Sequence, residues 1–181
     1  VDVFYYIRRQ DDWMVSMWQQ WGHKYGMSLE EFIDERLSVE EPLYMGAARL
    51  FEDVYGEDRV SVTPLSRKVL IGGDLVTDFG ERAGILPLDT DSQSPPQNRS
   101  MSSFVCDVLA RVPDVYDADR VAPAGRTDKK VRRLLERTLR SPDLLLNSDK
   151  RLLSPQERRR VMSHFAEVNR ALRERYFPEA S

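Results

Sequence analysis

The first 21 residues show a clear change of hydrophobic pattern. Positions 3–7 read VFYYI, a run of β-branched and aromatic residues that predicts a strand buried on both faces of a sheet. The pattern breaks at Arg8 and then takes a helical period, with apolar residues at Trp13, Met14, Met17, Trp18 and Trp21. We therefore expect a strand near residues 1–7 that turns at once into a helix, with Asp11 or Asp12 as the helix cap.

Two helices and a second strand are predicted next. Ser28 and Glu31 form a capping box before a helix whose buried positions are Leu29, Phe32, Ile33 and Leu37. Pro42 suits the first turn of another helix, which ends before Gly56 and has the apolar stripe Leu43, Ala47, Leu50, Phe51 and Val54. Residues 60–63 then read as a short strand closed by Pro64. Because helices connect the two strands, we expect them to be parallel.

The pattern predicts further helices after Pro64. Gly72, Gly73 and Asp74 introduce a helix that ends at Gly84, and its predicted inward residues are Leu75, Val76, Phe79 and Ala83. Residues 86–100 read as a surface loop. Ser102 or Ser103 caps a helix predicted to bury Phe104, Val105, Val108 and Leu109, and a basic amphipathic helix is expected over 131–139.

The last predicted helix has the strongest start signal. Ser154, Pro155 and Glu157 combine a capping box with proline at the first helical position. The helix should be long, with Val161, Phe165, Val168 and Leu172 on its buried face. Altogether the pattern indicates an α/β chain that is predominantly helical, with a small parallel sheet (strands near 1–7 and 59–63) covered by helices.

Composition narrows the class of protein. The 181 residues, 41% hydrophobic and 31% charged, are typical of one soluble globular domain spanning 1–181. A net charge of -3 argues against general nucleic-acid binding. The single cysteine, Cys106, excludes an internal disulfide and fits a reducing compartment, so a cytoplasmic location is expected. No apolar run reaches the roughly 18 residues that span a bilayer.

The first residue lies inside the predicted strand. Val1 has no initiator methionine before it and no earlier element with which the strand pairs. We therefore expect the chain to be a fragment of a longer protein.

The strand-to-helix junction is the best candidate site. Arg8 leaves the carboxyl end of the strand and Ser16 lies eight residues later, in the first turns of the helix. Such a junction, where helix N–H groups are free, is where open α/β sheets bind anions, so both side chains are predicted to converge on one phosphate. The alternative is that Arg8 or Arg9 merely pairs with Asp11 or Asp12.

Other candidate features have ordinary structural explanations. Trp13, Trp18 and Trp21 have the spacing of core residues, although tryptophans also stack on sugar rings. The arginines of 158–160 fit the solvated face of a helix better than an acidic-polymer site. The Gly72–Asp74 triplet lacks the Gly-Lys-Ser/Thr ending of a nucleotide loop and is interpreted as a cap. No role is assigned to His23, and two histidines are too few for a histidine metal cluster.

Two segments resemble the P-loop-fold sulfotransferases of the carbohydrate and heparan-sulfate type and their bacterial relatives. YIRRQDDWMVS places Arg8 and Ser16 on that family's Arg and Ser, which hold the 3'-phosphate of the sulfate donor PAPS. SPQER at 154–158, followed by Asn169 and Leu172, resembles the family's C-terminal segment, and VSVTP after YGEDR adds to the likeness.

The resemblance implies the C-terminal part of a P-loop-type three-layer fold. It also implies transfer of a sulfuryl group from PAPS to a hydroxyl of a sugar or polysaccharide, with Lys150 and Arg151 as the candidates for a basic loop that covers the cofactor. The family's phosphate-binding loop and catalytic base are expected upstream of Val1, so no catalytic residue is assigned here. Two alternatives stay open: a non-catalytic helical module for carbohydrate binding or assembly, and another P-loop-fold transferase such as a kinase.

Overall fold

The structure is a computed structural model, and it describes residues 1–85, 102–111, 137 and 153–178. Its contacts divide the chain into two compact units. The strand unit comprises Val1–Asp12, Glu40–Gln97 and Arg159–Ser181, and the helical unit comprises Trp13–Val39 and Asn98–Arg158. The prediction of one domain over 1–181 stays a prediction. The predicted loop at 86–100 and helix at 131–139 fall largely or wholly outside the described residues.

The predicted pair of parallel strands is confirmed. Strand β1 is Val3–Ile7 and strand β2 is Val60–Pro64, and they pair in parallel from Val3 opposite Val60 to Ile7 opposite Pro64. One further hydrogen bond extends the ladder, because the Leu65 N–H donates to the Ile7 carbonyl at 2.7 Å.

The predicted burial of β1 on both faces was wrong. Val3 to Tyr6 are half-buried, and only Ile7 is buried. The described sheet has two strands, so each of them has a strand neighbour on one side only.

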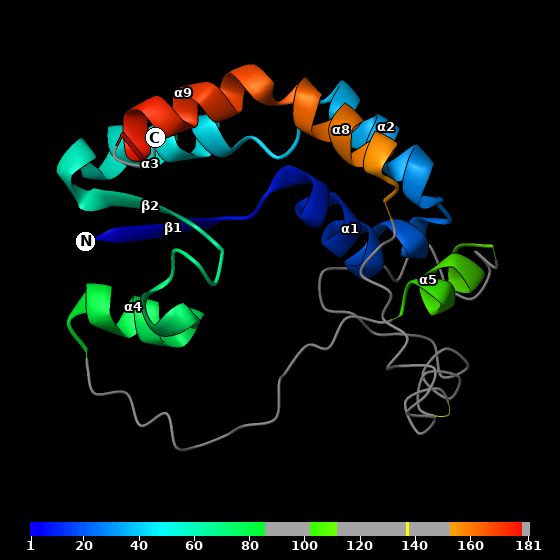
Figure 1. The fold of residues 1–181 in the computed structure, drawn as a ribbon, viewed down its shortest axis with the longest axis horizontal. Helices are drawn as coiled ribbons and strands as arrows, with labels where there is room; N and C mark the ends of the chain where they lie inside the picture. The colour runs from blue at the N-terminus through cyan, green and yellow to red at the C-terminus, as the bar shows by residue number, and fades with distance from the viewer. Residues whose placement is uncertain (86–101, 112–136, 138–152, 179–181) are drawn as a thin grey trace. The chain divides into compact units, whose positions relative to one another are not determined.

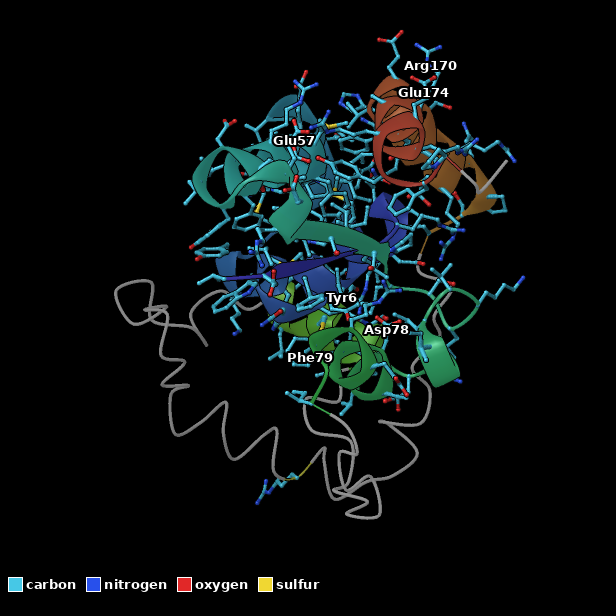
Figure 2. All side chains as sticks on the ribbon, turned by 90° about the vertical axis from the view of Figure 1, so that its left-hand side faces the viewer. Tyr6, Glu57, Asp78, Phe79, Arg170 and Glu174 are labelled. Carbon is cyan, nitrogen blue, oxygen red and sulfur yellow. The ribbon has the colours of Figure 1, made fainter. Side chains whose placement is uncertain are left out.

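Helices lie on both faces of this sheet. Helices α3 (Tyr44–Tyr55) and α9 (Ala166–Tyr176) lie over one face and α4 (Leu75–Ala83) lies over the other (Figure 1). Side chains of β1 alternate between them, as a strand requires. The Tyr5 ring packs edge-on against Phe51 of α3, with centroids 5.5 Å apart, while Phe4 meets Phe79 of α4 at 5.6 Å. Figure 2 shows Phe79, Asp78 and Tyr6 on this second side.

The remaining described elements are short helices. They are α1 (Gln10–Gln20), η1 (Gly22–Tyr25), α2 (Leu29–Ser38), η2 (Glu57–Arg59), η3 (Ile71–Gly73), α5 (Ser103–Ala110) and α8 (Pro155–His164). The described chain is thus mostly helical with one small parallel sheet, as the pattern predicted.

The predicted cap of α1 was wrong, because the helix begins at Gln10 and both Asp11 and Asp12 lie inside its first turn. The predicted caps of α2, α4, α5 and α8 are confirmed. The Ser28 hydroxyl accepts from the Glu31 N–H while the Glu31 carboxylate accepts from the Ser28 N–H. Ser154 and Glu157 make the same reciprocal pair before α8. Asp74 accepts from the N–H groups of the first turn of α4, and Gly84 ends that helix with φ 67°. Ser102 caps α5. Each cap satisfies helix-end N–H groups within three or four residues, which is why the sequence predicts it.

The predicted buried face of α3 was wrong. Leu43 just before the helix, and Leu50 and Val54 within it, are exposed, whereas Tyr44, Ala48 and Glu52 are buried. The burial of Glu52 has a clear cause. Its carboxylate accepts hydrogen bonds from Arg175 and Tyr176 of α9, so a charged residue takes part in the interior. Pro42 lies just before α3 and not in its first turn.

The buried faces of α4 and α5 also differ from the prediction. Leu75, Val76 and Phe79 are at least 40% exposed, while Asp78 is fully buried because Tyr6, Arg82 and the Ile71 N–H satisfy its carboxylate. In α5, Phe104 and Val108 are exposed, and Cys106, Leu109 and Ala110 are the buried apolar residues. Within the helical unit, α5 packs against η1, and the Cys106 thiol donates to the Gln19 carbonyl of α1 at 3.8 Å.

The predicted long C-terminal helix is interrupted at one residue. Helix α8 ends at His164 and α9 begins at Ala166, with Phe165 between them at φ -92° and ψ 10°. Val161, Phe165 and Leu172 are buried as predicted, but Val168 is 38% exposed.

Candidate functional site

The carboxyl end of the strand pair forms the candidate site. Arg8 follows the last residue of β1, and its side chain is exposed. The Leu65-to-Ile7 hydrogen bond aligns the two strands at this end, and Arg8 and Leu65 follow the last paired residues, Ile7 and Pro64. Carboxyl ends of parallel strands are where open α/β sheets bind their ligands.

The predicted structural ion pair is made by Arg9 alone. Its Nη2 and Nε lie 2.6 and 2.7 Å from the two carboxylate oxygens of Asp11, which is fully buried. Hydrogen bonding to Asp11 is the main cause that raises the pKa of Arg9. Arg8 forms no ion pair with a described residue. The structural alternative therefore accounts for Arg9, Asp11 and Asp12, and it leaves Arg8 available to a ligand.

Tyr44 adds a buried hydroxyl beside Arg8. The residue is only 6% exposed, and its oxygen makes no hydrogen bond of ordinary geometry with a described residue. Burial is the main cause that raises the pKa of Tyr44, and the backbone and charge of Arg8 partly oppose this shift. The ring is held edge-on to Tyr5, with centroids 6.3 Å apart.

The first residue of α1 is fixed by a distant amide. Gln10 is buried, and its side-chain amide donates to the Asn169 Oδ1 of α9 at 2.5 Å and accepts from the Asn169 Nδ2 at 3.3 Å. This reciprocal pair ties the start of α1 to α9, both within the strand unit. In the sequence, Asn169 was singled out only by the family resemblance. The structure gives it a structural role, because it holds Gln10, which lies two residues after Arg8.

The second predicted ligand lies further along α1. Ser16 is the seventh residue of the helix and is half-buried. At a rise of 1.5 Å per residue, it lies about 9 Å along the helix axis from Gln10. Arg8 belongs to the strand unit and Ser16 to the helical unit, so their convergence on one phosphate stays a prediction.

The prediction that Lys150 and Arg151 cover the cofactor is not tested by the structure. Lys150 and Arg151 fall outside the described residues. Two cations that the sequence analysis did not single out also lie near this end of the sheet. Arg67 and Lys68 follow β2 by three and four residues, and both are exposed. The sequence did contain an indication of these two cations, the pair RK that directly follows VSVTPLS.

The aromatic residues of the helical unit have mixed positions. Trp18 is buried and its indole N–H donates to the Met27 carbonyl at 2.8 Å, so its predicted core position is confirmed. Trp13 and Trp21 are half-buried, and the Lys24 ammonium lies 4.3 Å from the Trp21 ring centroid. His23 is fully buried, its Nδ1 lies 3.1 Å from the Trp18 carbonyl, and burial lowers its pKa.

Across the described residues, no group of three or more His, Cys, Asp and Glu side chains is arranged to hold a metal ion. None of the described helices has the length and apolarity needed to cross a membrane. No protein-family model, curated protein or solved structure matches the chain.

Proposed function

We propose that this chain is part of a sulfotransferase that transfers a sulfuryl group from PAPS to a hydroxyl of a carbohydrate or similar acceptor. In this proposal Arg8 and Ser16 bind the 3'-phosphate of the cofactor. The observation that carries it is the state of Arg8: an exposed guanidinium at the carboxyl end of a parallel strand, without an ion pair to a described residue. Layers of helices on both faces of the sheet support the finer assignment to a P-loop-type fold.

The site fits an anionic cofactor. Guanidinium groups bind phosphate through two parallel N–H···O bonds. Arg8 is available for such a contact because it forms no ion pair with a described carboxylate. The start of the following helix is held in place by the Gln10–Asn169 pair. This pair limits the freedom of the backbone two residues after Arg8, so less backbone freedom is lost when a ligand binds.

The chemistry divides between cofactor and protein. When bound, PAPS supplies the activated sulfuryl group. The role of Arg8 and Ser16 is to hold the 3'-phosphate, which is remote from the bond that breaks, so both contribute positioning and affinity. Removing either is expected to weaken cofactor binding more than it slows the bound complex.

Arg8→Ala tests the proposal. In the full-length protein, the affinity for adenosine 3',5'-bisphosphate, measured by calorimetry, should fall about tenfold or more, because a charge-assisted contact to phosphate is lost. Arg59→Ala is the matched control. Arg59 is equally cationic, but it lies at the amino end of β2 and pairs with Asp2 at 3.0 Å. Unchanged affinity in Arg8→Ala would overturn the cofactor assignment.

The same titration separates the two alternatives. A non-catalytic carbohydrate module would bind an oligosaccharide but not the bisphosphate. A kinase would prefer ATP with Mg²⁺ and would lack the dependence on a 3'-phosphate.

A further inference from the structure

We propose that Arg67 and Lys68, which follow β2, complete the anion site begun by Arg8, so that one phosphate dianion is held from both strands. This inference rests on the proposed function and extends it to residues that the family resemblance does not assign. Arg8, Arg67 and Lys68 are called here the carboxyl-end cations.

The strand register brings these residues together. Arg8 and Leu65 follow the last paired residues, Ile7 and Pro64, of adjacent parallel strands, which are about 4.8 Å apart. Arg67 is two residues beyond Leu65, so its Cα lies within about 7 Å of the Leu65 Cα. The long cationic side chains of Arg8, Arg67 and Lys68, which follow the two strands, therefore start close enough to one another to reach a single anion.

The backbone that carries Arg67 and Lys68 is well defined. The Ser66 N–H donates to the Pro64 carbonyl at 2.8 Å, and the N–H groups of Val69 and Leu70 both donate to the Ser66 carbonyl. Leu70 is buried and anchors the far side of the turn. These contacts make a closed turn with the two cations at its exposed corner.

Gly73 allows the chain after this turn to pass close to the Arg67 carbonyl. Gly73 has φ 69°, and a Cβ there would meet the Arg67 carbonyl at 3.4 Å. The Gly73 N–H donates to the Leu70 carbonyl at 2.9 Å. The backbone of Arg67 is thus supported from the η3 side, which limits the freedom that a bound anion would have to remove.

The charges at this end are unbalanced among the described residues. None of the carboxyl-end cations forms an ion pair with a described residue, and the segment 65–73, LSRKVLIGG, contains no acidic residue. Two aspartates of the neighbouring η3–α4 segment already have hydrogen-bond partners, whereas the exposed Glu81 of α4 has none among the described residues. Asp78 accepts from Tyr6, Arg82 and the Ile71 N–H, and Asp74 accepts from the first turn of α4.

The amino end of the same strands shows the opposite arrangement. There Arg59 pairs with Asp2, and Glu57 pairs with Arg175 at 2.9 Å. The whole chain has a net charge of -3, so the surplus of cations at the carboxyl end of the sheet is local. It creates a positive potential there, which favours an anionic ligand.

The experiment compares two nucleotides that differ by one phosphate. Calorimetry on the full-length protein measures adenosine 3',5'-bisphosphate against adenosine 5'-monophosphate for wild type, Arg67→Ala, Lys68→Ala and the control Arg59→Ala. We expect Arg67→Ala to weaken the bisphosphate about tenfold and Lys68→Ala about threefold, because arginine makes two hydrogen bonds to phosphate where lysine acts as a point charge. The monophosphate should be unaffected.

Each outcome bears on one proposal or both. If Arg8→Ala removes the preference for the bisphosphate while Arg67→Ala and Lys68→Ala keep it, the proposed function stands and this inference falls. Inorganic pyrophosphate serves as a second probe. If it binds in an Arg67-dependent way while the two nucleotides bind equally, the anion site stands and the sulfotransferase assignment falls. If no probe responds to Arg67→Ala or Lys68→Ala, the site is refuted.

Discussion

The strand unit contains charged residues in two contrasting settings. On the α4 side of the sheet, the fully buried Asp78 carboxylate accepts from the Tyr6 hydroxyl at 2.7 Å and from the Arg82 Nε at 2.7 Å. At the carboxyl end of the same strands, the carboxyl-end cations are exposed and have no ion pair to a described residue. The charge of Asp78 is therefore satisfied by hydrogen bonds within the protein. The carboxyl-end cations remain available to a ligand.

A second internal network lies on the opposite side of the sheet. The Glu52 carboxylate of α3 accepts from the Arg175 Nη2 and from the Tyr176 hydroxyl of α9, both at 2.8 Å. It joins two helices that are far apart in the sequence. The contrast teaches that in this protein a charged residue with a full set of partners belongs to the fold, whereas an unpartnered cation at a strand end is a candidate for binding.

The largest expected effect comes from breaking the internal network of Asp78. Asp78→Ala should lower the free energy of unfolding by about 3 kcal/mol, because Arg82, Tyr6 and the Ile71 N–H all lose their acceptor. Urea denaturation measures the loss. The exposed Asp53→Ala on α3 is the control and should change stability by less than about 0.5 kcal/mol. A similar small change in Asp78→Ala would remove the contrast between the two settings.

A smaller and pH-dependent effect is expected at Glu52. Burial raises the pKa of this carboxyl, but hydrogen bonds from Arg175 and Tyr176 together with the charges of Arg175 and Arg49 outweigh burial and lower it below its ordinary value of 4.5. Its stabilising contribution is therefore present above that value and is lost as the pH falls through the lower folded-state pKa. At about pH 7, Glu52→Gln should cost about 2 kcal/mol.

Acid titration of stability checks this sign. The difference in unfolding free energy between wild type and Glu52→Gln should shrink as the pH falls to about 3, because the protonated carboxyl then resembles the amide. A difference that stays constant or grows on acidification would contradict the network's role.

The smallest effect on stability is expected at the carboxyl-end cations. Replacing any of them by alanine should change the free energy of unfolding by less than about 0.5 kcal/mol, since none has an ion pair to lose among the described residues. The same urea denaturation applies, alongside the binding measurements that these variants should fail. A loss above about 1 kcal/mol would assign these residues to the fold.

The sequence predicted those parts of the structure that depend on local geometry. The capping pairs Ser28–Glu31 and Ser154–Glu157 join groups three residues apart, so their pattern is sufficient to place a helix start. The hydrophobic run of β1 and the crossover to β2 predicted a parallel pair, and both are confirmed. For the site, the same reasoning placed Arg8 at the end of a strand.

The buried faces of the helices could not be predicted in the same way. Glu52 counts as polar in any hydrophobic pattern, yet it is buried because Arg175, 123 residues later, hydrogen-bonds to it. Asp78 is buried for a similar reason, because the Tyr6 hydroxyl, 72 residues away in the sequence, donates a hydrogen bond to it. A hydrophobic pattern classifies each residue by itself. The burial of a charged residue depends on whether the fold brings a hydrogen-bonding partner to it.

The amino-acid sequence by itself determined the strands, the starts of the helices with side-chain caps and the position of Arg8, because these follow from steric preference and from hydrogen bonds made within a few residues. Only the tertiary structure decided that Arg9, and not Arg8, pairs with Asp11, and that Arg67 and Lys68 share the end of the sheet with Arg8. The physical reason is that ion pairing and strand register depend on which distant groups meet. A charge is neutralised by its neighbours in space, and those neighbours are set by the fold.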